Sequence, residues 1–250
     1  MRKYGLIGYP LGHSFSQKYF SEKFRNERIS GCIYENYPLS DINQLPALIA
    51  GDPELCGLNV TIPYKSEVLS FLDAIDSEAS EIGAVNVIKI KRSDQKVRLE
   101  GFNSDITGIS DSVKPYIKDY MKQALVLGTG GSSRSVCHVL KKLGLNVIQV
   151  SRESRAGVIT YSDITQDVIE DTDLIVNTTP LGMYPAKEGK PELNYSLLSR
   201  KQILFDLVYN PEITQFLKAG KEQGCTIISG IKMLFSQAER AWEIWNDDSM

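Results

Sequence analysis

A chain of 250 residues can form one large domain or two small ones, and either is long enough to bury a hydrophobic core. Hydrophobic residues make up 42% of the chain and charged residues 24%, as in soluble globular proteins, while the net charge of -3 and the lack of a basic run argue against a nucleic-acid partner. No segment approaches the roughly 20 apolar residues of a membrane span, and Pro10 ends the first apolar run before the core of a signal peptide, so we expect a cytoplasmic protein with no membrane partner.

The N-terminal part of the chain mixes strand and helix patterns. Short apolar runs are typical of strands, and Ser16 is a suitable cap for a helix that carries Phe20 and Phe24 on one face. Two alternating runs on either side of residues 92–95 predict a hairpin. We expect strands at 4–8, 32–37, 55–61, 85–90 and 97–99, and helices from Ser16, over 41–50 and over 63–71.

From residue 123 onward the strands become short and wholly apolar, as in buried parallel sheets. Residues 113–122, which are polar and contain Pro115, form the expected linker. The alternation of strands and helices predicts a doubly wound α/β domain. Its expected strands are 124–127, 147–150, 174–176 and 203–205, with a helix over 133–143 and a last helix from 231 to about 245.

A glycine-rich loop, Gly128-Thr129-Gly130-Gly131-Ser132-Ser133, joins the first of these strands to its helix. Such a loop brings backbone N–H groups and a helix N-terminus to a phosphate, although many strand-to-helix turns use glycine for its backbone freedom alone. The apolar strand before the loop and the helix after it favour a dinucleotide site over a plain turn.

The end of the second strand bears on the choice of dinucleotide. An NAD site usually has an acidic residue here for the ribose 2′-hydroxyl, whereas an arginine suits the 2′-phosphate of NADP. Ser151-Arg152-Glu153 provides the arginine, followed by a carboxylate that repels a phosphate. The sequence favours NADP and leaves NAD as the alternative.

Polar residues in the first part of the chain predict a second site. Ser14 and Ser16 flank the start of the first helix, where hydroxyls and free N–H groups suit a carboxylate; a simple cap is the alternative for Ser16. Lys65 and Asp105 follow mainly apolar runs, and singly they fit an exposed lysine and a helix-capping aspartate. The four cysteines are scattered and the chain has two histidines, so we expect no metal centre.

Eight segments resemble, in order, the motifs of the shikimate and quinate dehydrogenase family, and they span nearly the whole chain. The first four are G-Y-P-L-G-H-S-F-S (8–16), L-N-V-T-I-P-Y-K (58–65), G-A-V-N (83–86) and G-F-N-S-D-I-T-G (101–108). The other four are G-T-G-G (128–131), N-T-T-P-L-G-M (177–183), D-L-V-Y-N-P (206–211) and G-I-K-M-L-F-S-Q-A (230–238).

The resemblance implies the family's fold and reaction. The family pairs a small α/β substrate domain, here residues 1–104 plus 231–250, with a Rossmann-type doubly wound NADP-binding domain, here 105–230. The implied reaction is the reversible NADPH-dependent reduction of 3-dehydroshikimate to shikimate, which serves aromatic amino acid biosynthesis, by a monomer or homodimer. An NAD-using quinate/shikimate dehydrogenase and a non-catalytic binding protein on the same fold are the alternatives.

The resemblance also assigns roles to residues. Lys65 is the implied acid/base group, because an ammonium supplies a proton and a positive charge to a developing alkoxide; Asp105 pairs with it, and the sequence leaves open which of the two moves the proton. The implied substrate-binding residues are Ser14 and Ser16 for a carboxylate, with Tyr209 as a further donor, and Asn59, Thr61, Asn86 and Gln237 for ring hydroxyls. The implied cofactor-binding residues are Gly128, Thr129, Gly130, Gly131, Ser132, Ser151, Arg152, Thr178, Met183 and Gly230.

Overall fold

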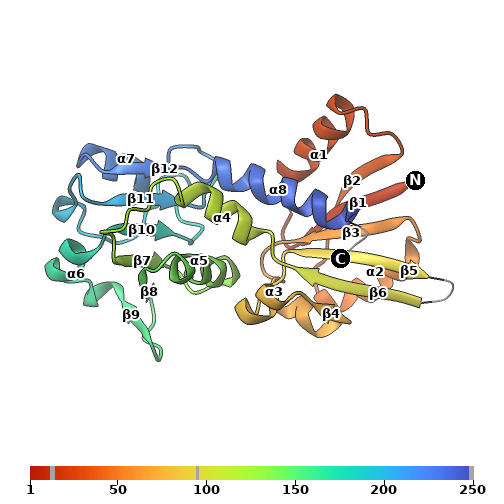
Figure 1. Ribbon diagram of the computed structural model, residues 1–250, viewed down its shortest axis with the longest axis horizontal. Helices are drawn as coiled ribbons and strands as arrows, with labels where there is room; N and C mark the ends of the chain where they lie inside the picture. The colour runs from red at the N-terminus through yellow and green to blue at the C-terminus, as the bar shows by residue number, and fades with distance from the viewer. Residues whose placement is uncertain (12–14, 94–95, 248–250) are drawn as a thin grey trace. The chain divides into compact units, whose positions relative to one another are not determined.

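Two compact units, each with its own six-stranded sheet, make up the chain (Figure 1). The computed structural model describes residues 1–11, 15–93 and 96–247. Unit 1 comprises Met1–Ser104 and Ala238–Met250, and unit 2 comprises Asp105–Gln237. The last helix, α8 (Ile231–Asn246), contributes to both units, because its first seven residues belong to unit 2. The chain therefore divides at 237/238, whereas the sequence led us to expect 230/231.

The sheet of unit 1 has the order β2-β1-β3-β5-β6-β4. Its first three strands are parallel, and β5 runs antiparallel to β3. It also runs antiparallel to β6, as the predicted hairpin requires. The strands are β1 (Arg2–Gly8), β2 (Cys32–Pro38), β3 (Leu55–Val60), β4 (Ala74–Ile75), β5 (Val87–Ser93) and β6 (Lys96–Phe102).

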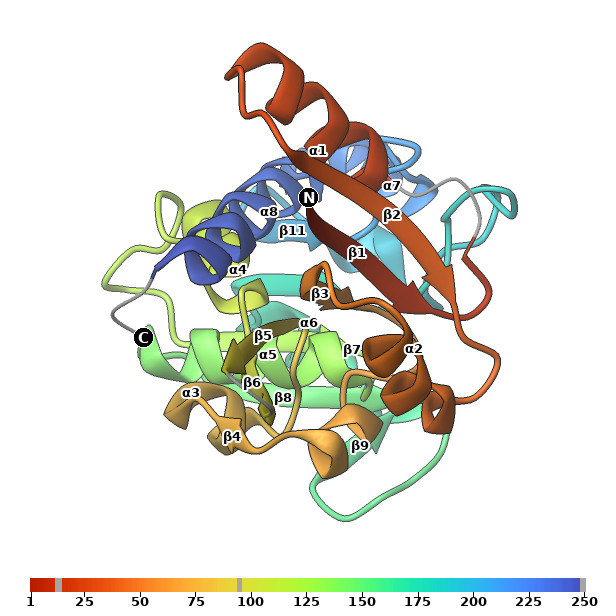
Figure 2. The same ribbon diagram turned by 90° about the vertical axis from the view of Figure 1, so that its right-hand side faces the viewer.

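Alternation along the strands of unit 1 gives the sheet two buried faces. Leu6 points into one apolar cluster and Ile7 into the other. Helix α1 (Phe15–Asn26) and the end of α8 cover the first face, and α1 lies beside β1 and β2 (Figure 2). The second face is covered by α2 (Leu45–Gly51), α3 (Ser77–Ile82) and the short 3-10 helices Ile42–Gln44 and Glu67–Phe71.

The sheet of unit 2 is entirely parallel, with the order β12-β11-β10-β7-β8-β9. This is the strand order of a dinucleotide-binding doubly wound sheet, whose direction of winding reverses between β7 and β10. The prediction of such a sheet is confirmed. The strands are β7 (Gln123–Leu127), β8 (Asn146–Ser151), β9 (Val158–Thr160), β10 (Leu174–Asn177), β11 (Ile203–Asp206) and β12 (Thr226–Ile228).

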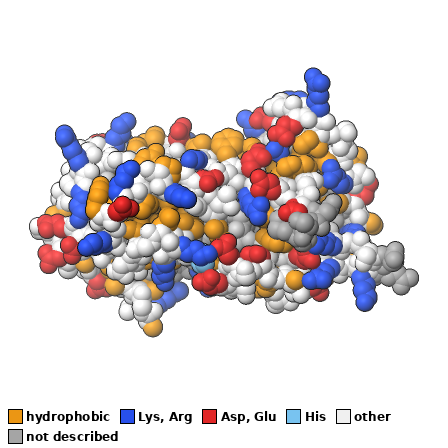
Figure 3. All heavy atoms as spheres, viewed as in Figure 1, with side chains coloured by type: hydrophobic (Ala, Val, Ile, Leu, Met, Phe, Trp, Pro, Cys, Tyr) orange, Lys and Arg blue, Asp and Glu red, His pale blue; other side chains and the backbone are white. Residues whose placement is uncertain are grey.

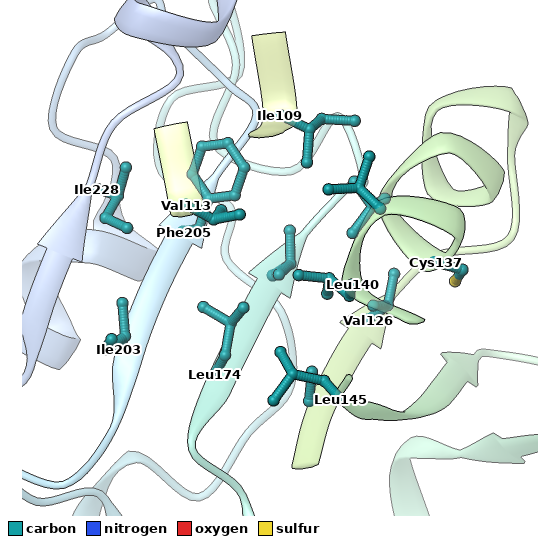
Figure 4. Packing of buried hydrophobic residues seen from close by; sticks show 14 of the residues in the cluster. Ile109, Val113, Val126, Cys137, Leu140, Leu145, Leu174, Ile203, Phe205 and Ile228 are labelled. Carbon is teal, nitrogen blue, oxygen red and sulfur yellow. The ribbon is translucent and has the colours of Figure 1, made fainter. Parts of the chain in front are cut away.

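Helices cover both faces of this second sheet. Val126 and Phe205 join a cluster that includes Ile109 and Leu140 (Figure 4), while their neighbours in the strands pack on the other face. Because both faces are buried, the strands are apolar throughout. The first face is covered by α4 (Asp105–Val113), α5 (Gly131–Lys142) and the start of α8, and the other by α6 (Gln166–Asp171) and α7 (Gln215–Glu222).

One predicted helix is wrong. Residues 63–71 form turns and a 3-10 helix, because the Lys65 carbonyl accepts a hydrogen bond from Val85 N at 2.7 Å and the Ser66 carbonyl from Leu69 N at 3.4 Å. An α-helix requires those carbonyls to accept from residues four positions further on. The long-range backbone hydrogen bond from Val85 therefore takes precedence over the local helical pattern.

The surface carries charges of both signs. On the face in Figure 3, basic and acidic side chains are interspersed with smaller apolar areas. Within residues 1–11, 15–93 and 96–247, none of the helices combines the length and the apolar character that crossing a membrane requires.

Gly57 is a position where the fold of unit 1 depends on the absence of a side chain. A Cβ added there would collide with the indole of Trp245, whose Nε1 donates to the Ile88 carbonyl at 3.0 Å. We expect Gly57→Ala to lower the free energy of unfolding by about 1–3 kcal/mol, measured by urea denaturation. Gly51→Ala is the matched control, because a Cβ there meets no described atom within 4 Å; an equal loss in both variants would contradict the explanation.

Candidate functional site

The loop after β7 approaches the loop after β10 closely in unit 2. Gly128 has a φ of +117°, and a Cβ added to it would lie 2.5 Å from Thr178 Oγ1. Thr178 in turn donates from N and Oγ1 to the Leu127 carbonyl, at 3.0 and 2.7 Å. Both the backbone angle and the contact require glycine at position 128. The site lies where the two halves of the sheet wind in opposite directions, which is where such sheets bind ligands.

The N-terminus of α5 follows this turn. Gly130 is the N-cap, with an extended backbone and no side-chain oxygen to occupy the first-turn N–H groups. Within the described residues, a Cβ added at Gly130 would meet no atom within 4 Å. Ser133 Oγ donates to the Gly128 carbonyl at 2.7 Å and accepts from Gln149 Nε2 at 3.0 Å, which fixes the turn. An open backbone at a helix N-terminus fits the pyrophosphate of a dinucleotide.

The end of β8 carries an ion pair beside the predicted cofactor-selecting arginine. Glu153 Oε2 lies 3.2 Å from Arg155 Nη2, and Glu153 N donates to Ser151 Oγ at 3.3 Å. Arg152 is exposed at the same turn. The Glu153 carboxylate therefore has a cationic partner, although both side chains are more than half exposed and the pair is weak.

Buried polar side chains join the loops that follow β10 and β11. Asp206 Oδ1 accepts from Asn177 Nδ2 and from Val208 N, both at 3.0 Å, and its Oδ2 accepts from Thr214 Oγ1 at 2.5 Å. Asn177 Oδ1 accepts from Thr179 N at 3.0 Å and from Thr179 Oγ1 at 2.6 Å. Burial raises the pKa of Asp206 to about 6, and the three donors oppose that shift.

The remaining residues predicted for unit 2 lie on these two loops, just before α8 and on α8 itself. Met183 is exposed after Gly182, and Tyr209 is partly buried, with a pKa that burial raises. A Cβ at Gly230 would lie 2.5 Å from the Leu207 carbonyl, so the chain before α8 passes directly against the β11 loop. Gln237 Nε2 donates to the Leu234 carbonyl at 3.1 Å on α8.

In unit 1, hydrogen bonds join several predicted substrate-binding residues. Asn59, on β3, donates from Nδ2 to the Asn86 carbonyl at 3.4 Å. Asn86 Oδ1 accepts from Ser104 N at 2.7 Å, and Asn86 Nδ2 donates to Ser104 Oγ at 3.0 Å. Tyr34 extends this row, because its hydroxyl donates to Asn59 Oδ1 at 2.7 Å.

The turn that carries Lys65 packs against the first motif. A Cβ at Gly8 would lie 2.5 Å from Thr61 Cγ2, so the two motifs meet at the end of β1. Tyr64 N donates to the Thr61 carbonyl at 3.0 Å, and the Lys65 carbonyl is held by Val85 N. Lys65 is partly buried within unit 1, while Asp105 is the first residue of unit 2 and begins α4. Ser14 lies outside the described residues.

The sequence analysis missed Tyr34, Ser104 and Asp206 as members of these networks. Tyr34 lies on the buried face of an alternating strand, and a buried tyrosine hydroxyl usually needs a partner. Asp206 follows an apolar strand directly, where an ionised carboxylate needs donors. Both signals are present in the sequence, but neither identifies the partner.

Comparison with known proteins gives consistent matches. Residues 6–88 match the family model for the shikimate dehydrogenase substrate binding domain. The curated shikimate dehydrogenase (NADP(+)) of Methanococcus aeolicus is 35% identical over 260 residues, which cover 96% of this chain and 90% of that protein. The crystal structure of shikimate dehydrogenase from Aquifex aeolicus is similar with a TM-score of 0.86 at 31% identity, covering 98% and 92% of the two chains. Quinate dehydrogenase from Corynebacterium glutamicum in complex with NAD has a TM-score of 0.84 at 26% identity, covering 98% and 93%.

The buried carboxyl of Asp206 predicts a pH-dependent contribution to stability. Its pKa of about 6 in the folded protein exceeds the ordinary value of about 3.9, so protonation stabilises the fold. That stabilisation is complete below pH 4 and is lost as the pH rises through 6. The difference of about two pKa units corresponds to roughly 3 kcal/mol.

We expect the free energy of unfolding of the wild type, relative to Asp206→Asn, to fall by about this amount between pH 4 and pH 7. Urea denaturation of both proteins across this range measures the difference. Subtracting the variant removes the titration of all other groups, so a constant difference would contradict the assignment.

Proposed function

This chain belongs to the shikimate dehydrogenase family, and we propose that it catalyses the reversible, NADPH-dependent reduction of 3-dehydroshikimate to shikimate. The observation that carries the proposal is the presence of two complementary sets of groups: an open glycine cradle at the start of α5 and a row of neutral polar side chains in unit 1. The first fits a dinucleotide and the second fits a polyhydroxylated ring.

In the proposed enzyme, unit 2 holds the cofactor. The backbone of Gly128, Gly130 and Gly131 and the first turn of α5 bind the pyrophosphate, with Thr129 and Ser132 beside it. Arg152 binds the 2′-phosphate and Ser151 supports that turn. We assign Thr178, Met183 and Gly230 to the end of the cofactor site that would hold the nicotinamide ring. When bound, NADPH supplies the hydride for the ketone carbon.

The polar residues of unit 1 bind and orient the substrate in this proposal. Ser14 and Ser16 donate to the carboxylate, and Tyr209 is a further donor. Neutral amides and hydroxyls suit ring hydroxyls, because a substrate that lacks one leaves a buried polar group unpaired at a cost of roughly 1–3 kcal/mol. The residues proposed for this role are Asn59, Thr61, Asn86 and Gln237.

Lys65 completes the reduction by giving a proton to the ketone oxygen as that oxygen becomes an alkoxide. Its positive charge also stabilises the negative charge that develops there. Asp105 hydrogen-bonds the same oxygen and orients Lys65. In the reverse direction Lys65 takes the proton back from the hydroxyl. The cytoplasmic location and the monomeric or homodimeric state expected from the sequence remain predictions.

Replacing Lys65 tests the proton-transfer step. We expect Lys65→Ala to lower kcat for shikimate oxidation at least about 100-fold, because general acid–base catalysis typically contributes a factor of 10²–10⁴. The dissociation constant of NADP+ should stay within about twofold, since unit 2 holds the cofactor. Nicotinamide absorbance and fluorescence titration measure the two quantities.

Lys96→Ala is the matched control for this test, because Lys96 is an exposed lysine of the same unit. Normal turnover of the Lys65 variant would remove the proposed mechanism. No turnover by the wild type, with either shikimate or quinate and either nicotinamide cofactor, would favour a binding protein on this fold.

Cofactor choice depends on the charges at the end of β8. Arg152→Ala should weaken NADP+ binding about tenfold or more and leave NAD+ binding within about twofold, because a charge-assisted bond to the 2′-phosphate is lost. Glu153→Gln should strengthen NADP+ binding, since it removes a negative charge that Arg155 balances only in part. Titration of both variants with NADP+ and with NAD+ measures the dissociation constants. Equal effects on NADP+ and NAD+ would instead support the NAD-using quinate/shikimate dehydrogenase.

A further inference from the structure

Tyr34 lies in the middle of β2, and its ring is held on several sides within unit 1. Its side chain is buried, with 4% of the residue exposed. The ring stacks on Phe20 with centroids 4.6 Å apart, and Trp245 lies 6.3 Å away. Aromatic packing of this kind leaves the hydroxyl a single well-defined position. The position of the ring thus determines which groups the hydroxyl can reach.

The Tyr34 hydroxyl reaches a residue that we propose to contact the substrate. It donates to Asn59 Oδ1 at 2.7 Å. Burial raises the pKa of Tyr34 well above its ordinary value, so the hydroxyl keeps its proton and remains a donor.

These bonds determine how Asn59 can meet a ligand. Its Oδ1 is occupied by Tyr34, and its Nδ2 donates to the Asn86 carbonyl at 3.4 Å. The amide is therefore held with Nδ2, which has two hydrogens, as the group that is able to serve a substrate oxygen. Without the tyrosine hydroxyl, Oδ1 would be a buried acceptor lacking this donor, and the amide would be free to turn over.

We propose that Tyr34 is a positioning residue for substrate binding, whose hydroxyl fixes the orientation of the Asn59 amide. This inference rests on the proposed function, because it assigns Asn59 to the substrate. The Tyr34–Asn59 bond stays in place when the substrate binds. The residue thereby favours substrates that present an oxygen acceptor to Asn59.

The test is Tyr34→Phe, which keeps the stacked ring and removes the hydroxyl. We expect KM for shikimate, and the dissociation constant of shikimate measured by calorimetry, to rise about tenfold. Turnover at saturation should change by less than about threefold and NADP+ affinity by less than about twofold, because the hydroxyl touches neither proposed reacting group.

Tyr4→Phe is the matched control. Tyr4 belongs to the same aromatic cluster, is 1% exposed and stacks on Trp245 at 4.8 Å. It is not among the residues that we propose to bind or position the substrate, so loss of its buried hydroxyl should leave KM unchanged. Thermal unfolding of both variants shows whether they lose similar stability.

A double-mutant cycle with Asn59→Ala isolates the proposed route. If Tyr34 acts through Asn59, adding Tyr34→Phe to Asn59→Ala should change the shikimate dissociation constant less than about twofold. A tenfold loss in that background, an unchanged constant in the single variant or an equal loss in Tyr4→Phe would each overturn the proposal.

The wild type separates this proposal from the proposed function. Turnover of shikimate by the wild type with an unchanged Tyr34→Phe would leave the function standing and overturn the role of Tyr34. Binding of shikimate without turnover would remove the proposed activity and still allow the expected change in the dissociation constant to support Tyr34. A wild type that neither binds nor oxidises shikimate would overturn both.

Discussion

Burying a polar group without a hydrogen bond costs roughly 1–3 kcal/mol, and this cost governs the strand ends of both units. In unit 2, Asn177 and Asp206 end neighbouring strands in register and bond to each other. In unit 1, Asn59 and Asn86 are linked in a similar way, through a side-chain amide and a carbonyl. The loops that leave these strands start from fixed points, and they carry the groups that we propose to bind ligands.

A second constraint, the close approach of backbone to a threonine, recurs in the two units. Gly8 at the end of β1 meets Thr61 after β3, and Gly128 at the end of β7 meets Thr178 after β10. In each case the glycine and the threonine lie at the ends of neighbouring parallel strands. Any side chain on the glycine would push the two loops apart. The glycines of the motifs therefore set the distance between loops as much as they provide backbone freedom.

The strands of both sheets could be predicted from the sequence, because alternating patterns and apolar runs depend only on which faces of a strand are buried. Leu6 and Ile7 separate into two clusters as their alternation requires, and the glycine loop follows an apolar strand as predicted. The predicted helix over 63–71 failed because a long-range hydrogen bond to Val85 competes with local propensity. Likewise, a sequence pattern indicates that Tyr34 is buried, but the partner of its hydroxyl, Asn59, comes from β3, at a distance along the chain that no local pattern encodes.

The buried carboxylate of Asp206 lowers the stability of unit 2 and at the same time favours one conformation of the loops around it. A carboxylate whose pKa is raised to about 6 by burial is largely ionised at neutral pH, so unit 2 is less stable there than a neutral side chain would make it. Its three donors come from Asn177, Val208 and Thr214, and they reduce this penalty only when all are in place. If one of these loops moved away, the buried carboxylate would lose a donor. Conformations with a displaced loop therefore have a higher energy than the ordered conformation. The same charge that lowers stability therefore makes the conformation of the loops after β10 and β11 more specific.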